Sequence, residues 1–420
     1  MNRMNTLIKL SRSLMILILA MSGPGVLRGQ IVETGLEGLM KSDFEILKGK
    51  RVGLVTNPTG VDRYLRSTVD ILFNAPGVTL SALFGPEHGV RGEFTAGEYV
   101  TSEKDPATGI PVYSLYGKTR KPTPEMFRDI DVIVYDIQDI GSRSYTFIST
   151  LGLVMEAAAE SNIPVVVLDR PNPLGGIRME GAVTRPGFIS FVSQFEIPYI
   201  HGLTVGELAL FLNGEGMLAN GIKCDLKVVK MTGWSRNMYF EETGLPWVPS
   251  SPHVPYRDSP LFYPATGIVG ELYTVSIGVG YTLPFQLFAA EWINADSLAS
   301  TMNSLKLPGV IFRPVHYKPY YSTLQGKMVH GVQIHLTDAT VAPLSLLQFY
   351  LIQEAHNLWP AMNVFEMCDP SRLAMFDKVC GTDSVRIAFA RYFKVSDITG
   401  LWTNDIPAFR KKASKYYLYD

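Results

Sequence analysis

The sequence has few cysteines, few charged residues and no long apolar run, and each shortage excludes a class of protein. Three cysteines among 420 residues are too few for a disulfide-stapled scaffold or a zinc site of paired CxxC motifs. Only 18% of residues are charged, and 38 basic residues against 39 acidic ones give a formal charge of −1, which provides no electrostatic footprint for nucleic acid. The chain is 46% hydrophobic, which argues against disorder. Its length predicts two domains with a large core.

The first 29 residues have the pattern of a secretory signal peptide. Three basic residues within the first 12 precede an apolar run at 14–21, and the helix breakers Gly23 and Pro24 follow. The run is far shorter than the roughly 20 residues that cross a bilayer. We therefore expect export, to a compartment such as a bacterial periplasm, without stable membrane insertion after cleavage; a retained anchor is the alternative. Removal of 1–29 takes away four basic residues and no acid, which changes the formal charge from −1 to −5.

Apolar strands alternate with helices in the first half of the mature chain. This alternation predicts an α/β fold, a Rossmann-like parallel sheet with helices on both faces, over residues 30–250. One helix is expected to begin after Thr204, whose hydroxyl forms a capping box with Glu207. The predicted strands are 51–57, 78–84, 111–116, 131–139, 164–169 and 225–231.

The alternation of strands and helices ends near Trp247, where closely spaced prolines predict an irregular connection up to Pro264. A smaller α+β domain is expected beyond it, over residues 251–420, with a cleft between the two domains. Its expected strands are 274–281, 310–316 and 329–336, and its expected helices are 344–358, 384–393 and 407–416.

Candidate site residues lie where the predicted strands of the first domain end. Ligands of an open parallel sheet bind at the carboxyl ends of its strands, and three successive strands bring ionisable or polar residues to that edge. These residues are Glu87, His88 and Arg91, then Asp136, Gln138, Asp139, Arg143 and Tyr145, then Asp169, Arg170 and Asn172.

Each of these groups also has a structural interpretation, and the sequence leaves both open. Asp136 and Asp139 fit a catalytic carboxylate pair or a metal site equally in residue type. The structural alternatives are a tight turn with a solvated carboxylate at Glu87, helix caps or an ion pair with Arg143 for Asp136 and Asp139, an internal ion pair between Asp169 and Arg170, and a core or loop histidine at His201.

Other chemistries find little support. The sequence has no GxSxG elbow and no HExxH motif. His330 and His335 are the closest histidines, but their odd spacing places them on opposite faces of a strand, so no metal is expected. An exported chain has little access to nucleotide cofactors. A carboxylate-centred site remains, and glycoside hydrolysis is the natural class, with Glu87 as the acid. Arginines bind carboxylates in a bidentate manner, and those expected to hold a substrate carboxylate are Arg91, Arg143 and Arg170.

Five sequence segments resemble, in the same order, motifs of the bacterial exo-β-N-acetylmuramidase family, formerly a domain of unknown function. This resemblance implies a Rossmann-like domain that carries the site, closed by a smaller C-terminal domain. It implies release of terminal N-acetylmuramic acid from the non-reducing end of peptidoglycan fragments, without metal or nucleotide. The segments are LFGPEHGVRG (83–92), YSLYGKTRKPT (113–123), DVIVYDIQDIGSRSYTFI (131–148), VVLDRPNPLGG (166–176) and EIPYIHGLTVGELA (196–209).

The resemblance also assigns roles to residues. Glu87 takes the position of the proposed acid/base, and His88, Asp136 and Asp139 accompany it as catalytic candidates. Two positions depart from the family pattern: His253 replaces an asparagine, and Val279 replaces an arginine, which alters the cleft wall and leaves substrate choice open. The residues implied in substrate binding are Arg91, Gln138, Arg143, Tyr145, Asp169, Arg170, Asn172, His201, His253 and Glu271.

Two rival functions stay open. A periplasmic protein that binds muropeptides or glycans without turnover would keep the cleft and the arginines. An exported esterase or amidase would need an activated nucleophile, and Ser142 and Ser144 have no adjacent histidine in sequence.

Overall fold

A seven-stranded sheet forms the first domain of the computed structural model, which describes residues 31–92 and 103–420. The predicted signal peptide lies outside the described residues. The strand order is β3-β4-β2-β1-β5-β6-β7, parallel throughout except for the antiparallel edge strand β3. The predicted Rossmann-like sheet is thereby confirmed. The strands are β1 (Arg51–Thr56), β2 (Thr79–Gly85), β3 (Glu103–Lys104), β4 (Pro111–Ser114), β5 (Val132–Asp136), β6 (Val165–Leu168) and β7 (Leu226–Val229).

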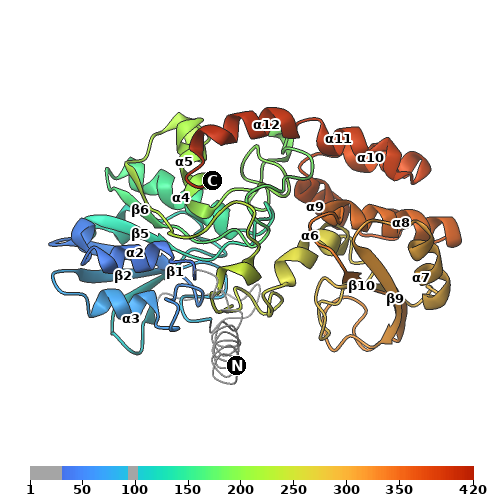
Figure 1. The fold of residues 1–420 in the computed structure, drawn as a ribbon, viewed down its shortest axis with the longest axis horizontal. Coiled ribbons are helices and arrows are strands. Elements are labelled where there is room, and N and C mark those ends of the chain that lie inside the picture. The colour runs from blue at the N-terminus through green and yellow to red at the C-terminus, as the bar shows by residue number, and fades with distance from the viewer. Residues whose placement is uncertain (1–30, 93–102) are drawn as a thin grey trace, which may run out of the picture.

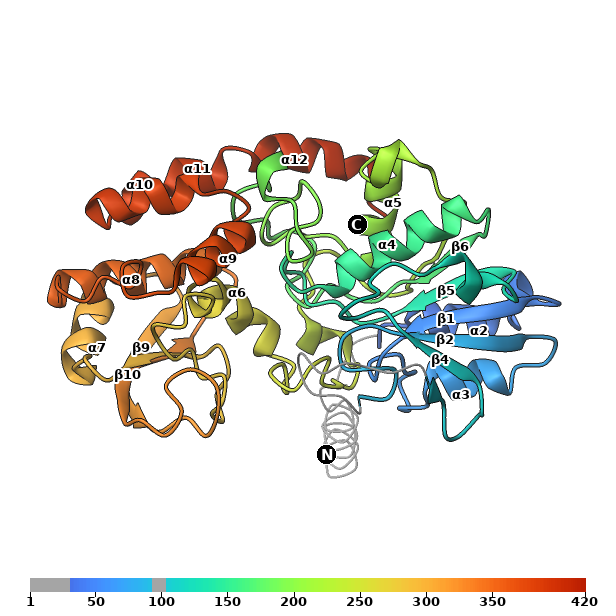
Figure 2. The same cartoon turned by 180° about the vertical axis from the view of Figure 1, so that it is seen from behind.

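Helices cover both faces of this sheet (Figure 1; Figure 2). Alternate residues of β5 enter separate cores, because successive side chains of a strand point to opposite faces. Val134 joins the core beneath α2 and α3, whereas Ile133 joins the core beneath α4 and α5. Thr204 caps α5 as predicted, with Glu207 completing the capping box. The helices are α2 (Gly35–Lys41), α3 (Thr68–Phe73), α4 (Phe147–Glu160) and α5 (Val205–Gly214).

The second domain is built on a three-stranded antiparallel sheet of order β8-β10-β9, which confirms the expected α+β class. Helix α7 packs on one face of this sheet, and α8 packs against α7 and α6. Its elements are α6 (Ser259–Gly270), β8 (Leu287–Ala290), α7 (Ala295–Ser304), β9 (Val310–Tyr317), β10 (Val329–Leu336), α8 (Leu347–Leu358), α9 (Pro370–Cys380), α10 (Ser384–Tyr392), α11 (Thr399–Thr403) and α12 (Ile406–Ala413).

Two sequence predictions for the second domain are wrong. Residues 274–281 do not form a strand, because Gly278 and Gly280 adopt φ values of +86° and +87°, and β8 lies further along the chain. The proline-rich connection is not irregular throughout, since α6 begins inside it. Pro260 occupies the first turn of α6, where a missing N–H breaks no helical hydrogen bond.

The described residues hold three free cysteines, so Cys368 and Cys380, whose pairing the sequence leaves open, are not joined. Within the described ranges, no helix has the length and apolar content needed to cross a membrane.

The chain returns to the first domain at its end. Helices α10 to α12 run along one edge of the molecule, and the segment 414–420, here the C-terminal strap, lies beside α5 (Figure 1). The Tyr419 hydroxyl donates to Asp169 Oδ2 at 2.6 Å and accepts from the Met231 N–H at 2.9 Å. The Leu418 N–H donates to Glu207 Oε1 at 2.9 Å. The strap therefore satisfies buried carboxylates of the first domain.

We expect Tyr419→Phe to lower the free energy of unfolding by about 1–3 kcal/mol, because a buried carboxylate and a backbone N–H both lose a partner. Burial raises the pKa of Asp169 to about 6, against the hydrogen bond from Tyr419, which favours the charged form. Since that bond is charge-assisted only when Asp169 is ionised, the loss should be larger at pH 8 than at pH 4.5. Urea unfolding of the wild type and the variant at both pH values measures this loss of unfolding free energy.

The matched control is Tyr392→Phe, a side chain 65% exposed on α10, which should leave stability unchanged. An equal loss at both pH values would contradict the proposed bond to the ionised carboxyl.

Candidate functional site

A cavity of about 870 Å³ lies between the two domains, where the sequence predicts a cleft. The first domain contributes the turn after β2 and the segment before α4. The second contributes the C-terminal half of α6 and the loop between β9 and β10. The principal polar and aromatic lining residues are Glu87, His88, Tyr116, Ser144, Tyr145, His253, Tyr263, Glu271, Tyr273 and Tyr321.

Glu87 reaches the cavity from a tight turn at the end of β2. The backbone reverses direction there through two positive φ values, +76° at His88 and +80° at Gly89. The side chains of Glu87 and His88 both line the cavity. Tyr116, which follows β4, is hydrogen-bonded to Glu87. Burial raises the pKa of Tyr116 to about 12, and the charge of Glu87 adds to the shift. The phenol therefore stays protonated and acts as a donor to the carboxylate.

One face of α6 forms the opposite wall of the cavity. Tyr263, Gly267, Gly270 and Glu271 all line it, and their spacing of four, three and one residues places them along one side of the helix. Gly267 allows α6 to pack closely against the first domain, since a Cβ at this position would lie 3.3 Å from the hydroxyl of the buried Tyr199.

The Tyr263 hydroxyl lies beside Ser144 at the cavity wall, 3.1 Å from Ser144 Oγ. Burial raises the pKa of Tyr263, and the charges of Glu271, Glu87 and Asp139 add to the shift.

Glu271 is held by an arginine of the second domain. Arg372, on α9, makes an ion pair with the Glu271 carboxylate and donates from Nε to the Glu271 carbonyl at 2.8 Å. Burial raises the pKa of Glu271, and the guanidinium opposes the shift.

His253 joins the connection between the domains to the loop after β9. Its Nε2 lies 3.0 Å from the Tyr321 hydroxyl. Burial lowers the pKa of His253, and the nearby His88 contributes in the same direction, so these two imidazoles share one region of the cavity.

Five of the residues predicted from the sequence thus meet in one cavity, and the other nine lie elsewhere. The five come from both domains: Glu87, His88, Tyr145, His253 and Glu271.

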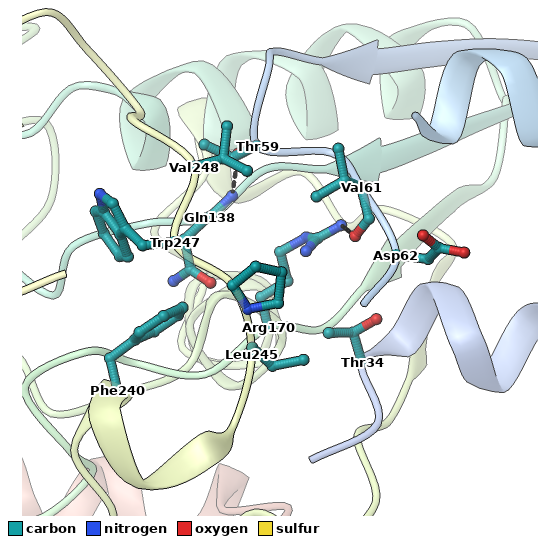
Figure 3. Close-up of a pocket in the computed structure, with 11 residues that line it drawn as sticks. Thr34, Thr59, Val61, Asp62, Gln138, Arg170, Phe240, Leu245, Trp247 and Val248 are labelled. Carbon is teal, nitrogen blue, oxygen red and sulfur yellow. Dashed lines mark hydrogen bonds between the residues drawn. The ribbon is translucent and has the colours of Figure 1, made fainter. Parts of the chain in front are cut away.

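Asp136 and Arg170 form a buried ion pair at the end of the sheet. Arg170 donates from Nε to Oδ1 at 2.5 Å and from Nη2 to Oδ2 at 2.9 Å, and Thr68 donates to Oδ2. Arg170 also lines, with Gln138, a separate cavity of about 20 Å³ (Figure 3). That volume holds about one water molecule, which excludes a sugar.

The other two arginines expected to hold a substrate carboxylate are engaged within the protein. The fully buried Arg143 donates to carbonyls of Ala182, Ile197 and Val379, at 2.6–2.9 Å. Arg91 is paired with Asp105 and Asp70.

Asp139 and His201 face each other behind the cavity. Gly141 donates its N–H to Asp139 Oδ2 at 2.7 Å, and His201 Nε2 lies 3.4 Å from the same oxygen. The Leu203 N–H donates to His201 Nδ1, so the ring proton is on Nε2, toward the carboxylate.

Asp169 and Asn172 support the loops around the strand ends. Asp169 accepts from the Gly206 N–H at 2.7 Å, at the start of α5. The Asn172 side chain bridges the Leu174 N–H and the Leu203 carbonyl.

Sequence reasoning missed several tyrosines of the cavity. Tyr116 belongs to the segment at 113–123, and its signal was an aromatic residue at the end of the predicted strand 111–116. Tyr263 falls in the segment that the prolines mark as irregular, and Tyr273 lies between that segment and the expected strand 274–281. Recognition of a helix there would have placed Tyr263 with Gly267 on one face.

A pair of histidines in the second domain was also missed. His316 and His330 are directly opposed on β9 and β10, with their Nδ1 atoms 2.7 Å apart. No group of three or more histidine, cysteine, aspartate or glutamate side chains within the described ranges is arranged to hold a metal ion.

Comparison with known proteins covers nearly the whole chain. Residues 52–258 match the family model "Exo-beta-N-acetylmuramidase NamZ, N-terminal", and residues 261–419 match "Exo-beta-N-acetylmuramidase NamZ, C-terminal". The peptidoglycan beta-N-acetylmuramidase NamZ of Bacillus subtilis (strain 168) is 45% identical over 388 residues, which are 92% of this chain and 91% of that protein.

Two solved structures of DUF1343 family proteins from Bacteroides fragilis NCTC 9343 are also similar. One is 56% identical with a TM-score of 0.89, and the other is 29% identical with a TM-score of 0.76. Each alignment covers 93% of this chain and 99% of the solved one.

We expect Asp136→Asn to lower the free energy of unfolding by about 3–5 kcal/mol, because Arg170 is left buried without its countercharge. Activity per folded molecule should stay within a few fold of the wild type, since Asp136 does not line the large cavity. Chemical unfolding and kinetics on the folded fraction measure the two effects.

Asp258→Asn is the control, since the ion pair of Asp258 with Arg257 is exposed and should contribute little. A thousandfold loss of kcat at unchanged stability would instead make Asp136 catalytic.

Proposed function

This chain belongs to the exo-β-N-acetylmuramidase NamZ family and is a glycosidase, and we propose that Glu87 is the acid with which it releases terminal N-acetylmuramic acid from peptidoglycan fragments. The carrying observation is the position of Glu87, which faces a cavity large enough for a sugar and lies between two domains that both match the family.

The chemistry of the step fits the groups around Glu87. Cleavage of a glycosidic bond needs a carboxylic acid beside the leaving oxygen and stabilisation of positive charge at the anomeric carbon. Tyr116 donates its hydroxyl to the Glu87 carboxyl and so holds that side chain in place. We assign the polar contacts with the substrate to His88, Tyr145, His253 and the Tyr263 hydroxyl of the α6 wall. We assign Asp139 and His201 to support behind the wall.

The proposal includes export. The basic start and apolar run of residues 1–29 support a signal peptide, and a periplasmic location would place the protein beside peptidoglycan. Muropeptides and glycan fragments are then its partners.

We expect Glu87→Gln to lower kcat/KM by at least about a thousandfold on a chromogenic β-N-acetylmuramide, because the leaving oxygen is no longer protonated. Binding of the sugar, measured by calorimetry, should persist. The wild type should cleave the muramide and not the corresponding N-acetylglucosaminide.

Glu125→Gln, at an exposed position outside the cavity, is the control and should keep wild-type kinetics. Turnover of the glucosaminide alone would contradict the substrate assignment. Absence of turnover of either compound, with binding retained, would support a glycan-binding protein.

The nucleophile is proposed to be the 2-acetamido group of the substrate. Glu271 is the second carboxylate that lines the cavity, but it is engaged in an ion pair with Arg372, so we do not assign it as the nucleophile. Assistance by the acetamido group retains configuration, so the first product in proton NMR should be the β-anomer. The α-anomer as first product would show inversion and refute this route.

A further inference from the structure

Tyr273 projects into the mouth of the cavity immediately after α6. Its side chain is 58% exposed, although it lines the cavity, and its neighbour Leu272 is buried in the core. The backbone of Tyr273 adopts a φ of +57°, which non-glycine residues rarely occupy and which clusters at functional sites. The turn that ends α6 thus places an aromatic ring in solvent at the edge of the site.

Arg372 fixes this ring from behind. Its guanidinium carbon lies 3.8 Å from the centroid of the Tyr273 ring. The same guanidinium is bound to the carboxylate and the carbonyl of Glu271, so its own position is set. Because Arg372 covers one face of the ring, the exposed area belongs to the other face and the edge.

An exposed, immobilised aromatic face beside a glycosidase cavity suits one kind of ligand. The C–H bonds on one side of a pyranose ring form an apolar surface of similar size to a phenol ring, and the two pack without loss of the sugar's hydroxyl contacts. A ring that is already held in place loses little conformational freedom when the sugar binds.

The position of Tyr273 selects which sugar it meets. Tyr145, on the first-domain side, is only 9% exposed, whereas Tyr273 is open to solvent. In an exo-acting enzyme the terminal sugar enters the closed end of the cavity, so the sugar that leaves lies at the mouth.

On the basis of the proposed function, we propose that Tyr273, fixed by Arg372, is the stacking platform for the leaving-group sugar. The platform recognises the second pyranose ring of the fragment and takes no part in bond cleavage.

The experiment compares a substrate with a second ring and one without it. The first is the disaccharide of N-acetylmuramic acid β-linked to N-acetylglucosamine, and the second is methyl β-N-acetylmuramide. Tyr273→Ala should raise KM about tenfold or more for the disaccharide, with kcat little changed, and leave the methyl glycoside unaffected. Tyr273→Phe and Tyr273→Trp should retain the wild-type KM, because both keep a ring.

Tyr392→Ala is the matched control, an exposed tyrosine of α10 outside the cavity lining, and it should change neither substrate. Equal losses on both substrates, or no loss on the disaccharide, would overturn the platform. Failure of the wild type to cleave either compound would instead count against the proposed function. Calorimetry of the disaccharide with Glu87→Gln and with Glu87→Gln/Tyr273→Ala tests the platform without turnover; equal affinity would refute it.

Discussion

The buried ion pair between Asp136 and Arg170 determines where this molecule can bind a ligand. Asp136 ends the interior strand β5 with no exposed surface, and a charge in that position requires a partner. Arg170, two residues after β6, donates two hydrogen bonds to the Asp136 carboxylate and also binds the Val61 carbonyl. The edge at which parallel sheets usually bind ligands is therefore filled by protein at its centre. The space for a sugar lies to one side, beyond the turn that carries Glu87.

Arg143 is a second buried charge that takes its partners from the protein, and it lies at the contact between the domains. Its guanidinium is fully buried, and burial lowers the pKa of Arg143 to about 10. Carbonyl groups of the first domain and the carbonyl of Val379, on α9, take its hydrogen bonds. Because α9 also carries Arg372, this buried arginine connects the core of the first domain to the helix that holds Glu271 and Tyr273. The two walls of the cavity are thus set relative to each other.

Strong local patterns made most of the first domain predictable. The apolar strand predicted at 131–139 and the Thr204–Glu207 capping box depend on neighbours in sequence. Both are present, the strand as Val132–Asp136. The motif at Glu87 also pointed to the part of the sheet edge that faces the large cavity. The sequence could not distinguish Glu87 from Asp136, because the difference is the partner that each carboxyl meets. That partner lies 34 residues away for Asp136, and its side-chain direction is a tertiary property.

The second domain was less predictable because its signals conflict. Closely spaced prolines favour an irregular chain, yet Pro260 falls in the first turn of α6, where helix geometry accepts it. The missed helix carries Tyr263 and leads into Tyr273, so these two aromatic residues of the cavity wall were missed with it. His316 and His330 show the same limit, since only the register of β9 against β10 brings them together.

The C-terminal strap has a consequence for the order in which the chain acquires its structure. Tyr419 and Leu418 satisfy carboxylates that precede them in the sequence by 250 and 211 residues. During synthesis from the N-terminus, the first domain emerges complete in strands and helices but with Asp169 and Glu207 still lacking these partners. Domains commonly fold one after another as they leave the ribosome. Here the first domain reaches its final packing only after the C-terminal strap, which follows the second domain, has been made. The final packing of the two domains is therefore coupled in one late folding step.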